Sequence, residues 1–301
     1  MHVRRLALIL IPALCALPTG CVRSLAINAA ADALTGTGGS FQSDDDPELV
    51  RDAIPFGLKV NESLIDAAPG NPKLLLAAAA NFTQYAYAFL QQDADRLDEK
   101  DPEQAKHLLG RARRMYARAR GYGILGLEAR HEGFTAKLEK DRAAAVADCG
   151  KDDVPLLYWT AAAWAAEISI TKTDAKLLGH LPDVDALIAR ALELDEAYAS
   201  GSIHEFYVSW EAAKTDRDHV KRAKAHFDRA LELADGKRMS PYLAWAEGID
   251  VAQQNKKEFL QLVDKVLAFN PDEAPRFRLV NLITQDRARR VKARVDDLFA
   301  E

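Results

Sequence analysis

The sequence has few cysteines, no strong excess of one charge and few β-branched residues. Its net charge is −5, and acidic and basic residues are interleaved along the chain. Because no basic stripe is present, the chain lacks the charge pattern that binds nucleic acid, and no nucleic-acid partner is expected. Alanine, leucine, arginine and the acidic residues dominate instead. This composition favours helices.

The N-terminal segment has the pattern of a secretory signal. Arg4 and Arg5 precede an apolar run from Leu6 to Leu17. This run is shorter than the roughly 20 apolar residues that span a bilayer. A positive start before a short apolar run predicts a signal peptide over residues 1–20.

Cys21 follows this segment directly and is preceded by the small pair Thr19-Gly20. A small pair before a cysteine resembles the lipobox of bacterial lipoproteins, so we predict lipidation at Cys21. Pro18 replaces the usual apolar residue of that motif, and an ordinary secretory cleavage nearby is the alternative. Val22 follows the cysteine where an aspartate would retain the protein at the inner membrane. The expected location is therefore the periplasm, lipid-anchored to the outer membrane.

The remaining cysteines give no disulfide. Cys15 lies in the predicted signal peptide, and Cys149 has no second free thiol once Cys21 is lipidated. No intramolecular disulfide is therefore expected in the mature chain. Cys149 is expected to be a small packed residue.

Residues 21–46 are predicted to be a lipidated, flexible tether. Glycine and serine between Gly36 and Ser40 are typical of a flexible spacer. The aspartates at 44–46 stand before Pro47, a residue that suits the first turn of a helix, and acidic residues stabilise that helix end. A calcium loop is the alternative, but the alternating ligands and the later bidentate glutamate are missing.

Residues 47–301 are predicted to form one all-α domain. Apolar residues recur with a period near 3.6, and no run alternates strictly as a strand would. The glycines at 121 and 123 are expected to interrupt one of the helices. The expected helices cover residues 47–68, 73–97, 101–119, 125–130, 135–147, 155–170, 183–194, 197–213, 220–234, 242–252, 259–267 and 275–299.

The second half of this domain contains a repeated pattern. The run Ala191–Asp195 recurs at Ala230–Ala234, and Val266–Pro271 follows at a similar distance. These intervals are slightly longer than the tetratricopeptide period of about 34 residues. We therefore predict tetratricopeptide-like helical hairpins stacked into a curved α-solenoid with a concave face. A helical bundle without superhelical order is the alternative.

Sequence motifs for catalysis and metal binding are missing. The chain has no Gly-x-Ser-x-Gly elbow and no phosphate-binding loop. His131 and His204 each precede a glutamate, but neither has a second histidine one turn later. His219 and His226 lie two turns apart, about 10 Å along a helix, and are expected at the surface. No metal, no other cofactor and no enzymatic activity are expected; a hydrolase that uses His204 and Glu205 is a minor alternative.

Aromatic residues cluster in three expected helices. They concentrate around Tyr85, around Trp159 and around His204. Such residues bury large apolar rings but still need hydrogen-bond partners. We interpret the clusters as the wall of a ligand pocket, with His204 and Glu205 as polar groups. Ordinary core packing of these rings is the alternative.

Five blocks in order resemble the T-component family of TRAP (tripartite ATP-independent periplasmic) transporters. They are Ala86–Phe89, Arg111–Tyr122, Leu157–Trp164, Gly201–Phe206 and a C-terminal block of Phe277–Asn281, Gln285–Arg290 and Asp296–Phe299. The resemblance covers nearly all of the predicted mature chain. Val291 and Lys292 depart from it locally, because family members often carry apolar residues there.

The resemblance implies a function that composition does not show. It implies a periplasmic lipoprotein that is an accessory component of a TRAP-type uptake system and forms a homo-oligomer, expected to be a trimer. Its expected partners are a periplasmic solute-binding protein and a small hydrophobic or organic-acid ligand. A repeat scaffold for protein–protein interaction at the outer membrane is the alternative. The candidate ligand-binding residues are Tyr85, Tyr116, Tyr122, Tyr158, Trp159, Trp164, His204 and Glu205.

Overall fold

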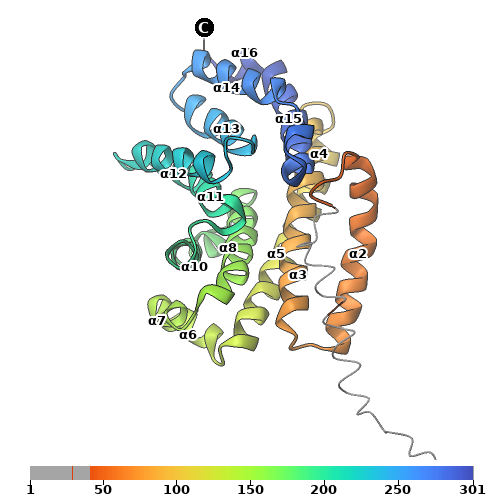
Figure 1. Ribbon diagram of the computed structural model, residues 1–301, viewed down its shortest axis with the longest axis vertical. Coiled ribbons are helices and arrows are strands. Elements are labelled where there is room, and N and C mark those ends of the chain that lie inside the picture. The colour runs from red at the N-terminus through yellow and green to blue at the C-terminus, as the bar shows by residue number, and fades with distance from the viewer. Residues whose placement is uncertain (1–28, 30–40, 301) are drawn as a thin grey trace, which may run out of the picture.

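The computed structural model describes Ala29 and residues 41–300, and every regular element in this part of the chain is a helix (Figure 1). The all-α prediction is therefore confirmed. The predicted signal peptide, Cys21 and most of the predicted tether lie outside the described residues. Across the described part, none of the helices combines the length and apolarity needed to cross a membrane.

The N-terminal helices start where proline and a capping side chain coincide. Asp46 accepts hydrogen bonds from the N–H groups of Glu48 and Leu49, and Asn71 and Asp101 cap the next two starts in the same way. These caps satisfy N–H groups that have no partner inside a helix. The elements are α2 (Pro47–Ala67), α3 (Pro72–Tyr85), the π-helix η1 (Ala86–Gln91), α4 (Gln92–Leu97) and α5 (Pro102–Arg130).

The expected interruption at Gly121 and Gly123 is wrong, because α5 runs unbroken to Arg130. A Cβ atom on Gly123 would lie 2.2 Å from Thr160 Oγ1, and one on Gly126 would lie 2.5 Å from Leu156 Cδ2. These two glycines therefore allow α5 to approach a later helix closely. The sequence alone does not distinguish such a contact from a helix break.

The middle of the chain is more divided than expected. The single helix predicted over 135–147 is wrong, because Asp141 ends one helix and caps the next by accepting the N–H of Ala144. The elements are α6 (Phe134–Lys140), α7 (Arg142–Ala147), η2 (Lys151–Asp153), α8 (Val154–Ser169), α9 (Ala175–Leu178) and α10 (Leu181–Leu194). Short helices lie between the long helices α5, α8 and α10, so the predicted helical hairpins are not evenly spaced along the chain.

The C-terminal third also differs at its helix boundaries. The helix predicted from residue 197 begins only at Ser202, because Ala199, Ser200 and Gly201 have positive φ angles. The helix predicted over 275–299 is likewise divided. The elements are η3 (Tyr198–Ser200), α11 (Ser202–Ala212), α12 (His219–Leu233), α13 (Ser240–Trp245), the π-helix η4 (Ala246–Asp250), α14 (Lys256–Ala268), η5 (Pro271–Glu273), η6 (Pro275–Phe277), α15 (Arg278–Ala293) and α16 (Val295–Leu298).

Long helices that follow one another in the chain, with short helices between some of them, pack side by side. The pairs α3 with α5, α8 with α10 and α11 with α12 are in extensive contact, and α5 packs on α8. Their apolar faces form one core under the N-terminal helices, a second around α8 and α10, and a third among α11 to α15. This packing agrees with helical hairpins, while a regular tetratricopeptide solenoid stays a prediction.

The C-terminal helix α15 returns to the beginning of the domain (Figure 1). Arg287 pairs with Asp95 at 3.0 Å, and Arg294 pairs with Glu99 at 2.6 Å. The N–H of Leu279 also donates to the carbonyl of Gln42. The helix α15 is therefore joined to α4 and to the segment before α2, chiefly through charged groups.

On its other side α15 is held by buried amides. Asn281 is fully buried, accepts the N–H of Met239 at 2.9 Å and donates to the carbonyl of Lys237. Gln285 donates to the carbonyls of Val266 and Phe269. Because buried polar groups must be paired, these bonds fix how α15 sits against the C-terminal helices. Arg287 is thereby held in a fixed place.

Candidate functional site

Polar groups on the π-helix η4 and on α4, which follows the π-helix η1, meet at α15. A π-helix holds an extra residue per turn, and such segments occur often at functional sites. Arg287 on α15 donates from Nε to both carboxylate oxygens of Glu247 on η4, at 2.9 and 3.0 Å. It also donates from Nη1 to Asp95 on α4, which follows η1 directly. One guanidinium therefore connects both π-helical regions.

Tyr87 on η1 lies in the same neighbourhood. Its side chain is 49% exposed, yet burial is the largest cause that raises the pKa of its hydroxyl. Arg287 lowers this pKa, and Glu247, Glu205 and Asp95 raise it. Tyr87 therefore offers an exposed aromatic surface, and its hydroxyl senses charged groups on α15, η4, α11 and α4. Tyr87 is therefore the centre of the candidate site.

Three of the predicted residues lie near this region. Glu205 on α11 forms an ion pair of 2.8 Å with Arg238. The ring of Tyr158 contacts those of Trp159 and Tyr198, with centroids 5.0 and 5.4 Å apart. Burial and then the charge of Glu205 raise the pKa of Tyr158. Tyr158, Trp159 and Glu205 therefore form one polar and aromatic group, which Glu205 links electrostatically to Tyr87.

Three predicted tyrosines lie instead within the N-terminal helices. Tyr85 is buried and its ring contacts Phe89. Tyr116 is fully buried and donates to Gln91 Oε1 at 2.8 Å. Tyr122 donates to Glu62 at 2.8 Å, and burial together with that bond raises its pKa to about 12. The hydrogen bond from Tyr116 to Gln91 connects α5 to η1, and the hydrogen bond from Tyr122 to Glu62 connects α5 to α2.

Trp164 is separated from the other predicted residues. It is buried, with the guanidinium of Arg120 4.9 Å from its ring and the ring of His180 at the same distance. Such contacts stabilise packing between helices. Two surface depressions, one on α6 and α7 and one on the Arg114 to Arg118 face of α5, include none of the predicted residues in their linings.

His204 is part of a histidine pair rather than a group with Glu205. Its Nδ1 lies 2.9 Å from Nδ1 of His226, whose ring stacks on Tyr207 at 4.4 Å. The expectation that His226 lies at the surface is wrong, because the fold turns it against α11, where it is half-buried. Burial and the neighbouring His204 lower the pKa of His226 to about 4. Burial also lowers the pKa of His204.

The histidine pair predicts a loss of stability in mild acid. The folded-state pKa of His226 lies below its unfolded value of 6.5, so unfolding takes up protons as pH falls from 6.5 towards 4. We expect the free energy of unfolding to lose about 2 kcal/mol over this range. Urea unfolding of His226→Gln should show a correspondingly flatter pH dependence. The exposed His107→Gln is the control; equal pH dependence in all three proteins would contradict this assignment.

Comparison with known proteins identifies the family. The family model described as "TRAP transporter T-component" matches residues 43–299, which is most of the chain. The chain belongs to the TRAP transporter T-component family. A similar protein from Treponema pallidum (strain Nichols), described only as uncharacterised, is 28% identical over 267 residues, which cover 87% of this chain and 83% of that protein. Family membership indicates association with a TRAP transport system, and hence a periplasmic, membrane-associated protein.

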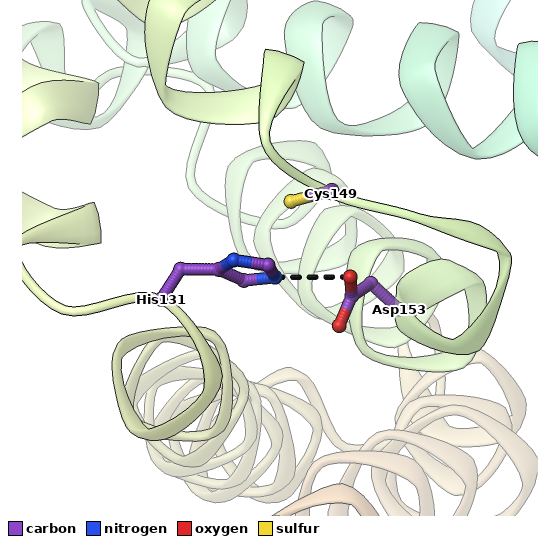
Figure 2. A group of neighbouring side chains, drawn as sticks. All are labelled: His131, Cys149 and Asp153. Atoms are coloured by element: carbon purple, nitrogen blue, oxygen red, sulfur yellow. Dashed lines mark hydrogen bonds and ion pairs between the residues drawn. The ribbon is translucent and has the colours of Figure 1, made fainter.

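One cluster of metal-ligating residue types occurs in the described part of this T-component (Figure 2). His131, Cys149 and Asp153 place ligand atoms within 4.8 Å of one another. Asp153 already accepts hydrogen bonds from Arg130 and from the N–H of Gly150, and pairs with His131 at 2.9 Å. Burial raises the pKa of the Cys149 thiol to about 11, so the thiolate that binds metals is disfavoured. The bonds of Arg130 and His131 to Asp153 hold the end of α5 against η2, which is a structural role.

Sequence reasoning missed the residues that organise the candidate site of this T-component. Tyr87, Glu247 and Arg287 are absent from the candidate residues that the sequence indicates. Arg287 does lie in the Gln285–Arg290 block that supports the family resemblance. That block is the available signal, but its contacts with α4 and η4 depend on distant parts of the chain.

Proposed function

We propose that this T-component is a binding protein of a TRAP-type uptake system, without a catalytic role, that holds a small apolar ligand at Tyr87. The single observation that carries the proposal is the exposed Tyr87 ring amid polar groups from four other elements. Small-molecule sites combine apolar or aromatic surface with a few polar groups that orient the ligand. Tyr87 provides the surface, and Arg287, Glu247 and Glu205 provide the polar groups.

The neighbouring aromatic group extends this site. Tyr158 and Trp159 on α8 and Tyr198 on η3 are in mutual contact, and Tyr158 and Trp159 are half-buried. They supply further apolar surface near Glu205. The buried Tyr116 and the amides of α15 hold η1 and Arg287 in place, so the site is largely preformed. In this proposal the remaining predicted residues support the helices instead of touching the ligand.

The proposal includes the cellular arrangement that the sequence predicts. The mature protein is lipidated at Cys21, anchored to the outer membrane, assembled as a homotrimer and docked to a periplasmic solute-binding protein. Membership in the T-component family supports a role beside a TRAP system. The interleaved surface charges and the lack of a basic stripe agree with protein and small-molecule partners.

Native mass spectrometry of protein purified from its own cell envelope tests this function. We expect an added small-molecule mass on the wild type, and its loss in Tyr87→Ala, since removal of the ring takes away the exposed apolar contact. The matched control is Phe56→Ala, which removes an aromatic ring that is 77% exposed on α2, away from η1. A wild-type protein that carries a bound peptide and no small molecule would favour the scaffold alternative.

A further inference from the structure

His204 on α11 and His226 on α12 turn the same ring nitrogen towards each other. Their Nδ1 atoms lie 2.9 Å apart, and their ring centres lie 5.1 Å apart. The usual sequence signal for a pair of histidine ligands is two histidines one turn apart on one helix. This pair lacks that signal because α11 and α12, which are in extensive contact, each supply one ring.

Both rings are neutral at neutral pH, because burial lowers the pKa of each of them. A neutral imidazole has one N–H, and its other nitrogen carries the lone pair that binds a metal ion. With both protons on Nε2, two Nδ1 lone pairs remain on neighbouring atoms. Nε2 of His204 lies 3.4 Å from a carboxylate oxygen of Glu196. A carboxylate at the second ring nitrogen is the arrangement that orients histidine ligands of metal ions.

The spacing of the two rings fits a tetrahedral metal ion. With metal–nitrogen bonds of about 2.0–2.1 Å, two imidazole rings on one tetrahedral zinc ion have their centres about 5.2 Å apart and their nitrogens about 3.3 Å apart. The ring centres of His204 and His226 already have this separation, so the nitrogens need to turn apart by only about 0.4 Å. Tyr207 stacks on the His226 ring at 4.4 Å and fixes its position.

The positive groups around the pair are compensated. Arg229 acts on His204, and Lys214 and Arg222 act on His226. Each of these three cations forms ion pairs with carboxylates: Arg229 with Glu196 and Glu232, Lys214 with Glu211 and Asp185, and Arg222 with Glu211 and Asp216. The charges near the pair therefore do not oppose a divalent cation.

We propose that His204 and His226 bind a divalent transition-metal ion such as Zn²⁺ through their Nδ1 atoms. The two rings fill two of the four tetrahedral positions, and water or another small ligand fills the others. Such an ion bridges α11 and α12 and remains exchangeable, because solvent supplies the rest of its ligands. The site is separate from the His131, Cys149 and Asp153 cluster, and it does not depend on ligand binding at Tyr87.

Isothermal titration of the folded mature chain with zinc chloride at neutral pH tests the site. We expect one zinc ion per chain. His204→Gln and His226→Gln should each weaken zinc binding by more than about tenfold, since even the loss of an outer partner of a ligand costs about that much. Glu196→Gln should weaken it by about tenfold. Cobalt(II) in place of zinc should give the visible absorption of a tetrahedral ion, which both histidine variants lose.

Two matched controls distinguish this site from other histidines. His107→Gln changes an exposed residue on α5, and His131→Gln changes the other group of metal-ligating residue types. Both should keep the wild-type zinc affinity, and circular dichroism checks that every variant folds. If His204→Gln is unfolded, His226→Gln decides the question.

Three outcomes would overturn the proposal. A wild-type chain that binds no zinc lacks the site. Loss of zinc binding in His131→Gln, with full binding in His204→Gln and His226→Gln, would place the ion at the other group. An equal small effect of all the histidine variants would indicate unspecific binding at the surface. None of these outcomes bears on the Tyr87 ligand, which native mass spectrometry tests independently.

Discussion

Replacing Asp250 with asparagine is expected to stabilise the protein by about 3 kcal/mol at pH 8. Asp250 ends η4 and is fully buried, with the side chains of Trp245 and Glu258 as polar neighbours and no cationic group among the causes of its pKa shift. Burial, followed by the charge of Glu258, raises its pKa from 3.8 to about 7. Ionisation of this buried carboxyl is therefore costly, and asparagine has nearly the same shape without the charge.

The sign of this effect follows from proton binding. Because the folded-state pKa of Asp250 is raised, the folded protein holds a proton that the unfolded chain releases between pH 4 and pH 7. The wild type therefore loses this stability as pH rises through that window. Urea unfolding at pH 5 and pH 8 should show a small gain for Asp250→Asn at pH 5 and a larger one at pH 8.

The control for this prediction is Asp98→Asn, whose side chain is exposed and whose substitution should change stability little at either pH. A pH-independent gain in Asp250→Asn would mean that the asparagine stabilises for another reason. The opposite pH dependence of the histidine pair does not interfere, because each variant is compared with the wild type at the same pH.

Gly123→Ala is expected to destabilise the protein by about 3 kcal/mol, whereas Gly121→Ala should stabilise it by up to about 1 kcal/mol. A Cβ atom at position 123 would meet Thr160 Oγ1 at 2.2 Å and the Thr160 backbone at 3.2 Å, so α5 and α8 would have to separate. At position 121 a Cβ atom meets nothing within 4 Å, and alanine is the better helix former.

Thermal or urea unfolding of the two variants gives a direct comparison within one helix. Thr160→Ala in the Gly123→Ala background should recover part of the loss, because it removes the hydroxyl but not the backbone contact. Equal effects at positions 121 and 123 would show that helix propensity, rather than the crossing with α8, controls α5. The same crossing brings α8, and with it Tyr158 and Trp159, to the side of the site.

Helix starts were the most predictable feature of the fold. Asp46 before Pro47 and Asp101 before Pro102 mark starts that the structure has at those residues. The prediction works because a cap and a proline act within one turn of the chain. Helix interiors were less predictable, since Gly123 looks like a break and is a packing contact, and Asp141 looks like part of a helix and is a cap.

Residues of the candidate site were predicted only in part. Aromatic clustering drew attention to Tyr158 and Trp159, whose rings are in contact because adjacent residues on one helix stay close in any fold; their role in ligand binding stays a prediction. Neither the aromatic clustering nor the family resemblance separated the buried Tyr116 from the exposed Tyr87. Their burial depends on which faces of η1 and α5 are covered by other helices, and the sequence of one helix does not contain that information.

The sequence by itself determined that the chain is helical, where most helices begin, and which family it belongs to, because these depend on local periodicity, capping and short ordered motifs. Only the tertiary structure decided that Arg287 lies between Asp95 and Glu247. Asp95 and Arg287 are 192 positions apart in the chain, and their contact requires every intervening helix to pack so that α15 returns to η1 and α4. Long-range packing therefore sets the charge at the Tyr87 site.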